Sequence, residues 1–230
     1  MNQAENASRG LGRTVTLVAR DGHSLSAYEA GFADSPRALV VLQEIFGVNH
    51  HIRAVCDGFA EAGYHVVAPA LFDRAERDVE LGYTPPEGQR GMQLRSRIAA
   101  EATLADVLAA ADHLGRESVG VIGYCWGGAL AWAGATQSTR FKAAVGWYGG
   151  GIAATATAHP NCPVQLHFGA LDDHIPLSDV EAIRTAQPGI EVFVYEGAGH
   201  GFGCNERPSY DARATALAQE RSLAFLQHNL

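Results

Sequence analysis

The chain has 230 residues, of which 47% are hydrophobic and 18% are charged, and its formal net charge at pH 7 is −8. These values are typical of one large globular domain, which buries roughly 70–75% of the surface of its unfolded chain. An acidic balance with no basic stripe excludes nucleic acid as an expected partner.

No apolar run approaches the roughly 20 residues that a membrane helix requires, and residues 1–13 lack the apolar segment of a secretory signal. The spacing of the four cysteines indicates neither a zinc site nor a disulfide framework. These are Cys56, Cys125, Cys162 and Cys204. We therefore expect a cytoplasmic protein, a monomer or small homo-oligomer, with no metal, no cofactor and no membrane contact.

In chain order, strands alternate with helices. The predicted strands are 13–20, 24–30, 38–43, 65–70, 119–122, 141–148, 163–168 and 190–195. The predicted helices are 50–63, 92–114, 128–135, 177–186 and 209–226, with an exposed loop at 71–91. The first two strands read as a hairpin, and residues 1–12 as a loose tail before a single domain, 13–230. The buried face of helix 92–114 is expected to be Leu94, Ile98, Leu104, Val107, Leu108 and Ala111.

This alternation predicts an α/β fold with a mostly parallel central sheet and helices on both faces. In such sheets, ligands bind beyond the carboxyl ends of the strands. Chemically reactive side chains that directly follow a strand are therefore the candidates for a functional site.

The segment 123–127 (GYCWG) joins a predicted strand to a small-residue helix and matches a nucleophile elbow, G-x-Nu-x-G. Cysteine occupies the nucleophile position. Cys125 would lie at a helix N-terminus, which favours a thiolate and a developing oxyanion. The pattern alone is loose, and a structural cysteine in a tight turn is the alternative. No G-x-S-x-G occurs in the chain, so no serine competes for the role.

Two later strands are followed by possible partners of Cys125. Asp172 follows strand 163–168, and His200 follows strand 190–195. The chain order nucleophile, acid, histidine is that of the α/β-hydrolase triad. His200 would take the thiol proton and later protonate the leaving group, and Asp172 would orient the imidazole. Asp173 is a neighbouring competitor for the acid role.

The segment 43–49 (QEIFGVN) directly follows the third predicted strand. In hydrolases of this fold, an amide at that point completes the oxyanion hole with the amide after the nucleophile. Here the donors would be Ile45 and Trp126. A carboxylate at Glu44 could accept the thiol proton or keep the thiol neutral until substrate arrives; the alternative is a solvated loop glutamate.

Together, segments 43–49 (QEIFGVN), 123–128 (GYCWGG), 199–202 (GHGF) and the segment around Asp172 resemble the dienelactone hydrolase (carboxymethylenebutenolidase) family. The likeness runs from about residue 13 over nearly the whole chain. It implies an α/β-hydrolase fold without a large cap domain, and a Cys-Asp-His triad that opens a lactone through an acyl-thioester intermediate. Family spacing favours Asp172 over Asp173, and by the same likeness Glu44 contacts the thiol and helps to generate the thiolate.

In the best-known members, arginines bind the free carboxylate of the substrate, one of them four residues after the catalytic histidine. Cys204 stands at that position here, and Arg207 is the nearby substitute. For the second arginine, Arg90 is preferred because its Arg-Gly pair falls where similar sequences place it. The other candidates are Arg74, Arg95 and Arg97, and each arginine could equally be a solvated charge.

Five aromatic residues could line an apolar pocket for a flat unsaturated ring, or could be core residues. They are Phe46, Trp126, Trp147, Tyr148 and Phe202. The sequence thus predicts a hydrolase of a small lactone or ester. The alternatives are a broader small-ester or thioester hydrolase, favoured by Cys204, and a non-catalytic ligand-binding protein of the same fold.

Overall fold

The computed structural model describes residues 12–230, so the expected tail, residues 1–12, lies outside the described residues except for its last position. The chain divides into two compact units, Met1–Val119 and Gly120–Leu230. Whether residues 13–230 act as the single domain expected from the sequence stays a prediction.

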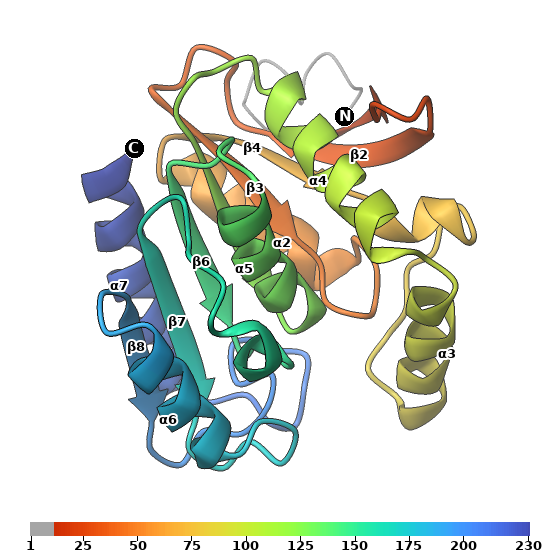
Figure 1. Ribbon diagram of the computed structural model, residues 1–230. Coiled ribbons are helices and arrows are strands. Elements are labelled where there is room, and N and C mark those ends of the chain that lie inside the picture. The colour runs from red at the N-terminus through yellow and green to blue at the C-terminus, as the bar shows by residue number, and fades with distance from the viewer. Residues whose placement is uncertain (1–11) are drawn as a thin grey trace. The chain divides into compact units, whose positions relative to one another are not determined.

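In the first unit, four strands lie in the order β1-β2-β4-β3 (Figure 1). Their bounds are β1 Arg13–Val18, β2 Ser24–Ala30, β3 Arg37–Leu42 and β4 Tyr64–Pro69. The pairs β1·β2 and β2·β4 are antiparallel, and β3·β4 is parallel. The predicted hairpin is confirmed, and Gly22 supplies the left-handed residue of its turn at φ +84°.

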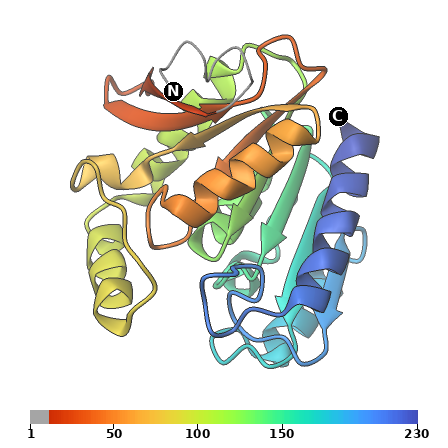
Figure 2. The ribbon, with the colours of Figure 1, turned by 180° about the vertical axis from the view of Figure 1, so that it is seen from behind.

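Helices cover both faces of these strands. Helix α4 (Ala100–His113) lies in front of them in Figure 1, and helix α2 (His50–Glu61) lies in front in the reverse view of Figure 2. The side chain of Asn49 caps α2 by accepting a hydrogen bond from the amide of Ile52 at 3.3 Å. Helix α2 confirms the prediction for 50–63, although it ends two residues earlier.

The prediction of a loop at 71–91 and one helix at 92–114 is wrong. A 3-10 turn, η1 (Leu71–Arg74), is followed by helix α3 (Pro85–Ser96), and α4 begins separately at Ala100. Pro85 occupies the first helical turn, where the missing N–H costs nothing, and Glu87 completes a capping box with Thr84. The two prolines at 85–86, which lie inside the predicted loop, therefore mark the start of a helix.

The break between α3 and α4 falls at Ala99, which takes an extended conformation (φ −68°, ψ 146°). No glycine or proline marks it, and the apolar spacing from Leu94 to Ile98 continues across it. The two helices also differ in burial, because α3 buries only Gly91 and Leu94 whereas α4 buries a whole face. Of the six residues predicted to be buried, Leu94, Val107 and Ala111 are buried and the others are half-buried.

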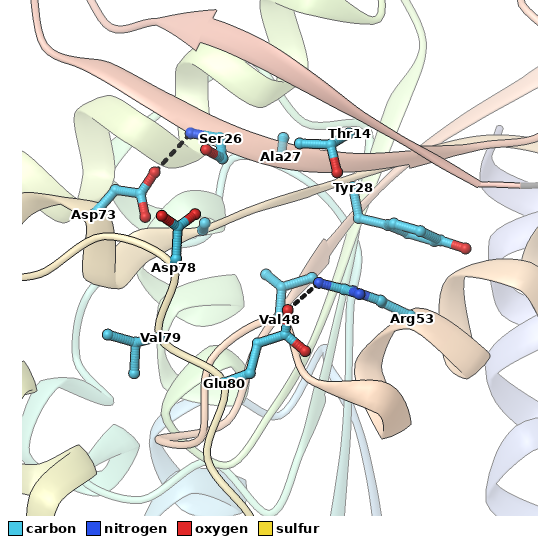
Figure 3. Close-up of a pocket in the computed structure, with 11 residues that line it drawn as sticks. Thr14, Ser26, Ala27, Tyr28, Val48, Arg53, Asp73, Asp78, Val79 and Glu80 are labelled. Carbon is cyan, nitrogen blue, oxygen red and sulfur yellow. Dashed lines mark hydrogen bonds and ion pairs between the residues drawn. The ribbon is translucent and has the colours of Figure 1, made fainter. Parts of the chain in front are cut away.

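A cavity of about 90 Å³ lies in the first unit, between β2, α2 and the loop after η1 (Figure 3). The carboxylate of Asp73 accepts a hydrogen bond from the amide of Ser26 at 2.7 Å, and Glu80 pairs with Arg53. These contacts attach the loop to the strand and the helix. None of the residues predicted for the functional site lines this cavity.

In the second unit, four parallel strands lie in the order β5-β6-β7-β8. The strands are β5 Val119–Tyr124, β6 Ala143–Trp147, β7 Val164–Gly169 and β8 Glu191–Tyr195. The helices are α5 Trp126–Gln137, α6 Leu177–Ala186 and α7 Ala212–Asn229. Helices α5 and α6 lie on the face shown in Figure 1, and α7 lies on the face shown in Figure 2. These elements confirm the predicted strands and helices to within a few residues.

None of the helices within residues 12–230 combines the length and the apolar character that crossing a membrane requires.

Among the described glycines of the second unit, Gly123 leaves the least space, because a Cβ atom there would lie 2.0 Å from the carbonyl oxygen of Gly127. We expect Gly123→Ala to lower the free energy of unfolding by ~2 kcal/mol or more, because the Gly127 carbonyl that the new Cβ meets belongs to backbone that cannot move aside. The matched control is Gly58→Ala in α2, where a Cβ meets nothing within 4 Å.

Gly58→Ala should raise stability by roughly 0.5–1 kcal/mol, since alanine favours a helix. Urea denaturation of the two variants measures both effects. Equal effects on stability would contradict the packing assigned to Gly123.

Candidate active site

The turn between β5 and α5 holds Cys125 in an unusual conformation. Its φ is 54° and its ψ is −115°, in a region that costs a residue with a side chain roughly 1–3 kcal/mol. The amide of Cys125 donates to the carbonyl of Trp147 at 3.0 Å, and the amide of Gly128 donates to the carbonyl of Cys125 at 3.0 Å. A Cβ at Gly128 would lie 2.6 Å from the Trp147 oxygen, so β6 and α5 approach closely only because this residue is glycine.

Cys125 meets a histidine and a carboxylate in this unit. The Nε2 atom of His200 lies 3.2 Å from Sγ of Cys125, and its Nδ1 atom lies 2.8 Å from Oδ2 of Asp172. Each residue follows the carboxyl end of a parallel strand, namely β5, β7 and β8. The order thiol, imidazole, carboxylate is the arrangement that activates a nucleophile.

The two candidate acids differ sharply in their surroundings. The second oxygen of Asp172 accepts hydrogen bonds from the amides of His174 and Ile175, at 2.8 and 3.1 Å. These bonds fix the carboxylate toward His200. The side chain of Asp173 is 84% exposed and contacts the ring of His174 at 3.6 Å. The geometry therefore favours Asp172.

The electrostatics of the group favour an imidazolium. Burial alone would lower the pKa of His200, but hydrogen bonds to Asp172 and Cys125 and their negative charge outweigh it and raise the pKa to about 10. Burial alone would raise the pKa of Asp172, but the bonds from His200 and the two amides hold it below its ordinary value. At neutral pH, a protonated His200 then stabilises negative charge on the sulfur.

Three of the predicted pocket aromatics form a buried cluster behind the histidine. The ring centroid of Tyr148 lies 5.3 Å from that of His200, edge to face, and Phe202 lies 5.4 Å from both Tyr148 and Trp147. All three side chains are almost fully buried. Their packing fits a role in holding His200 in place, and whether any of them touches substrate stays a prediction.

His174 was missed by sequence reasoning. Its ring centroid lies 4.9 Å from that of His200, at an interplanar angle of 90°, and its side chain is 67% exposed. It therefore forms the solvent-exposed edge of the histidine site. The only available signal was its place two residues after Asp172, since its ring contact depends on how the loop folds.

Arg207 lies against the loop that carries the histidine. A Cβ on Gly201 would be 2.3 Å from Nη1 of Arg207, and Gly201 has a φ of +73°. Glycine at 201 therefore leaves the space that this guanidinium occupies. Cys204, at the position where relatives of the predicted family place an arginine, is fully buried.

The remaining predicted site residues belong to the first unit. Glu44 is fully buried, so the alternative of a solvated loop glutamate is wrong. The carbonyl of Ile45 packs on Gly91 of α3, where a Cβ would lie 1.9 Å from it. The rings of Phe46 and Tyr83 pack at an interplanar angle of 60°, with their centroids 4.6 Å apart. The catalytic roles of Glu44 and Ile45 stay predictions.

Among the candidate arginines of the first unit, Arg74 donates two hydrogen bonds of 2.7 Å to the buried Asp106 and pairs with Asp21 at 2.8 Å. This arrangement indicates a structural role. Arg90 is exposed and pairs with Glu76. The guanidinium of Arg97 donates to the carbonyl of Ala75 at 3.2 Å.

Comparison with known proteins identifies the family of the chain. The model of the family described as "Dienelactone hydrolase family" matches residues 25–230. A provisionally named carboxymethylenebutenolidase from Synechocystis sp. is 37% identical, over 94% of this chain and 97% of that protein. The carboxymethylenebutenolidase of Pseudomonas putida is 33% identical, over 92% and 94% of the two chains. The crystal structure of a provisionally named dienelactone hydrolase from Klebsiella pneumoniae is 30% identical, with a TM-score of 0.82 over 94% and 98% of the two chains.

Together, the fold and these matches define a carboxylic ester hydrolase with the α/β-hydrolase fold and no large cap domain. The chain belongs to the dienelactone hydrolase family. The predicted fold class and family resemblance are both confirmed.

Titration of His200 tests the electrostatics of the group. In the wild type, the imidazole should lose its proton near pH 10. In Asp172→Asn the pKa of His200 should fall, because the carboxylate that accepts a hydrogen bond from Nδ1 has been removed.

The raised pKa also makes the stability of the fold depend on pH. Since the folded pKa exceeds the ordinary 6.5, protonation of His200 stabilises the fold below about pH 6.5, and this stabilisation is lost as the pH rises through about 10. NMR of the histidine ring signals measures the shift, and an identical pKa in both proteins would refute the assignment.

Proposed function

We propose that the protein opens a small lactone, or cleaves a small carboxylic ester, through a Cys125-Asp172-His200 triad and an acyl-thioester intermediate. The observation that carries this proposal is the position of His200. One ring nitrogen lies 3.2 Å from the sulfur of Cys125, and the other lies 2.8 Å from the carboxylate of Asp172.

In the first half of the reaction, the sulfur of Cys125 attacks the carbonyl carbon of the substrate. The C–O bond of the ester breaks as the imidazolium of His200 gives its Nε2 proton to the departing oxygen. The acyl group remains on sulfur as a thioester. When the substrate is a lactone, the released hydroxyl, or the enol it forms, stays attached to the acyl group.

In the second half, the neutral imidazole of His200 takes a proton from water. The resulting hydroxide adds to the thioester carbonyl, the C–S bond breaks, and the product leaves as a carboxylic acid. The thiolate and the imidazolium are thereby restored. Asp172 keeps the Nδ1 proton in place and stabilises the imidazolium in both halves.

Two further groups support the developing charge in this proposal. The amide of Trp126 is the first of helix α5, at the end where helix amides favour an anion, and the amide of Ile45 is its proposed partner in the oxyanion hole. Glu44 is proposed to control the protonation of the thiol. Its complete burial supports this role, because a carboxylate enclosed by protein needs a polar partner there.

Recognition of a substrate carboxylate is assigned to Arg207. Its guanidinium lies against Gly201, next in the chain to His200. The alternative reading, a broader ester or thioester hydrolase, is favoured by the buried Cys204 at the family arginine position. A non-catalytic ligand-binding protein would not require a thiol, an imidazole and a carboxylate in line.

Hydrolysis of cis- and trans-dienelactone and of p-nitrophenyl acetate by the wild type and by Cys125→Ala tests the proposal. We expect the wild type to hydrolyse a lactone, and Cys125→Ala to lose at least roughly 10³-fold in kcat because the sulfur that His200 contacts has been removed. Cleavage of the acetate alone would move the protein to the broader ester hydrolase. Inactivity on every substrate would favour the binding protein.

The same assay on Arg207→Gln separates carboxylate recognition from catalysis. The KM for dienelactone should rise roughly tenfold or more, while hydrolysis of the uncharged acetate changes little. Arg90→Gln is the matched control. A larger effect at Arg90 would transfer the role to that residue.

A further inference from the structure

A second cavity, of about 290 Å³, lies in the second unit away from the triad. Its walls come from the amino-terminal ends of β7 and β8 and from the last turns of α7, the helix in front of these strands in Figure 2. Gln165 is the second residue of β7, whereas Asp172 follows the other end of that strand. The strand rise separates the two by roughly 15–20 Å. The volume is at the lower end of the range of small-molecule sites.

Arg221 places a positive charge in this cavity. Its guanidinium carbon lies 4.1 Å from the ring centroid of Phe193, and its Nη1 donates to the hydroxyl of Tyr195 at 3.3 Å. Among residues 12–230, none of the ion pairs with a carboxylate involves this guanidinium. A planar guanidinium that lacks a carboxylate partner is suited to bind the carboxylate of a ligand by donating hydrogen bonds to it.

Glu191 places a negative charge at the other end of the same wall. Its Oε2 accepts a hydrogen bond of 2.7 Å from the side-chain nitrogen Nε2 of Gln165. Within residues 12–230, no lysine, arginine or histidine forms an ion pair with it. Glu191 and Phe193 lie on the same face of β8, two residues apart. The backbone positions of Glu191 and of Phe193, whose ring lies under the Arg221 guanidinium, are therefore about 7 Å apart along the strand.

One buried histidine orients both charged groups. The Nε2 atom of His167 lies 2.8 Å from the side-chain oxygen Oε1 of Gln165, and the side-chain nitrogen Nε2 of Gln165 already donates to Glu191. Nε2 of His167 must therefore carry the proton, and it also lies 3.0 Å from the hydroxyl of Ser222. Nδ1 is then an acceptor, and the hydroxyl of Tyr195 donates a hydrogen bond to it, with 2.7 Å between the nitrogen and the oxygen. The oxygen of Tyr195 in turn accepts a hydrogen bond from the guanidinium of Arg221.

This histidine stays neutral. Burial, and next the charge of Arg221, lower the pKa of His167 to about 3. Its two nitrogens thus act in opposite senses at every physiological pH: one fixes the orientation of Gln165 and hence Glu191, and the other fixes Tyr195 and hence Arg221. Two opposite charges fixed through one buried group are a preorganised pair.

We propose that this cavity binds a small zwitterion of the α-amino-acid type, at a site separate from the triad. The ligand carboxylate contacts Arg221, the ligand ammonium contacts Glu191, and an apolar side chain packs on Phe225 and Ala224. His228 and Asn229 complete the lining. Neither charged group belongs to the proposed catalytic machinery, so the proposal does not depend on the reaction.

Calorimetric titration of the full chain with three probes tests the site. The probes are L-phenylalanine, 3-phenylpropanoate, which lacks the amine, and 2-phenylethylamine, which lacks the carboxylate. We expect L-phenylalanine to bind at least tenfold more tightly than either analogue, because only the zwitterion satisfies both charges. Absence of binding by L-phenylalanine, or equal binding of an analogue, would overturn the proposal.

Variants locate the binding. Glu191→Gln and Arg221→Gln should each weaken binding of L-phenylalanine at least tenfold, and Arg213→Gln, an exposed α7 arginine outside the cavity, should leave it unchanged. Glu191→Gln keeps an oxygen that can accept from Gln165, so a loss there reports the charge and not the fold. Circular dichroism checks that each variant is folded. Unchanged affinity in Glu191→Gln and Arg221→Gln would place the ligand elsewhere.

Discussion

The strained backbone at Cys125 is the constraint on which the second unit depends. A cysteine at φ 54° is tolerated because its amide donates a hydrogen bond to the carbonyl of Trp147, and because Gly123 and Gly128 leave room for adjacent backbone. The strain of roughly 1–3 kcal/mol is offset by this packing. Its consequence is that the thiol projects from the end of β5 directly toward the ring of His200.

The parallel order of β5, β6, β7 and β8 explains why residues 75 positions apart in the chain meet. The loops that leave the carboxyl ends of these strands all begin at the same edge of the sheet, so the elbow and the Asp172 and His200 loops converge. At the opposite ends of β7 and β8, Glu191 of β8 and Arg221 of α7 line the second cavity. One short stretch of sheet therefore supports two chemically different sites at its two ends.

The sequence was sufficient for the parts of this arrangement that have local signals. The apolar runs, the glycines of the elbow and the order of Cys125, Asp172 and His200 predicted the strands and the grouping of the three side chains. Where a feature depends on tertiary packing, the sequence failed: no residue signals the break at Ala99, and the contact between His174 and His200 follows from the path of a loop. Sequence spacing within the family favours Asp172 over Asp173, and the physical distinction, two amide hydrogen bonds to Asp172, depends on how its loop folds.

The central claim is that the sulfur of Cys125 carries the acyl group. Rapid acid quenching of the enzyme during turnover of p-nitrophenyl acetate, followed by peptide mass spectrometry, tests it most directly. The account predicts an acetyl group on the peptide that contains Cys125, and its accumulation in a variant whose His200 is replaced by a side chain that cannot activate water. Turnover with an acetyl group on another residue, or with no acyl-enzyme in either protein, would contradict it.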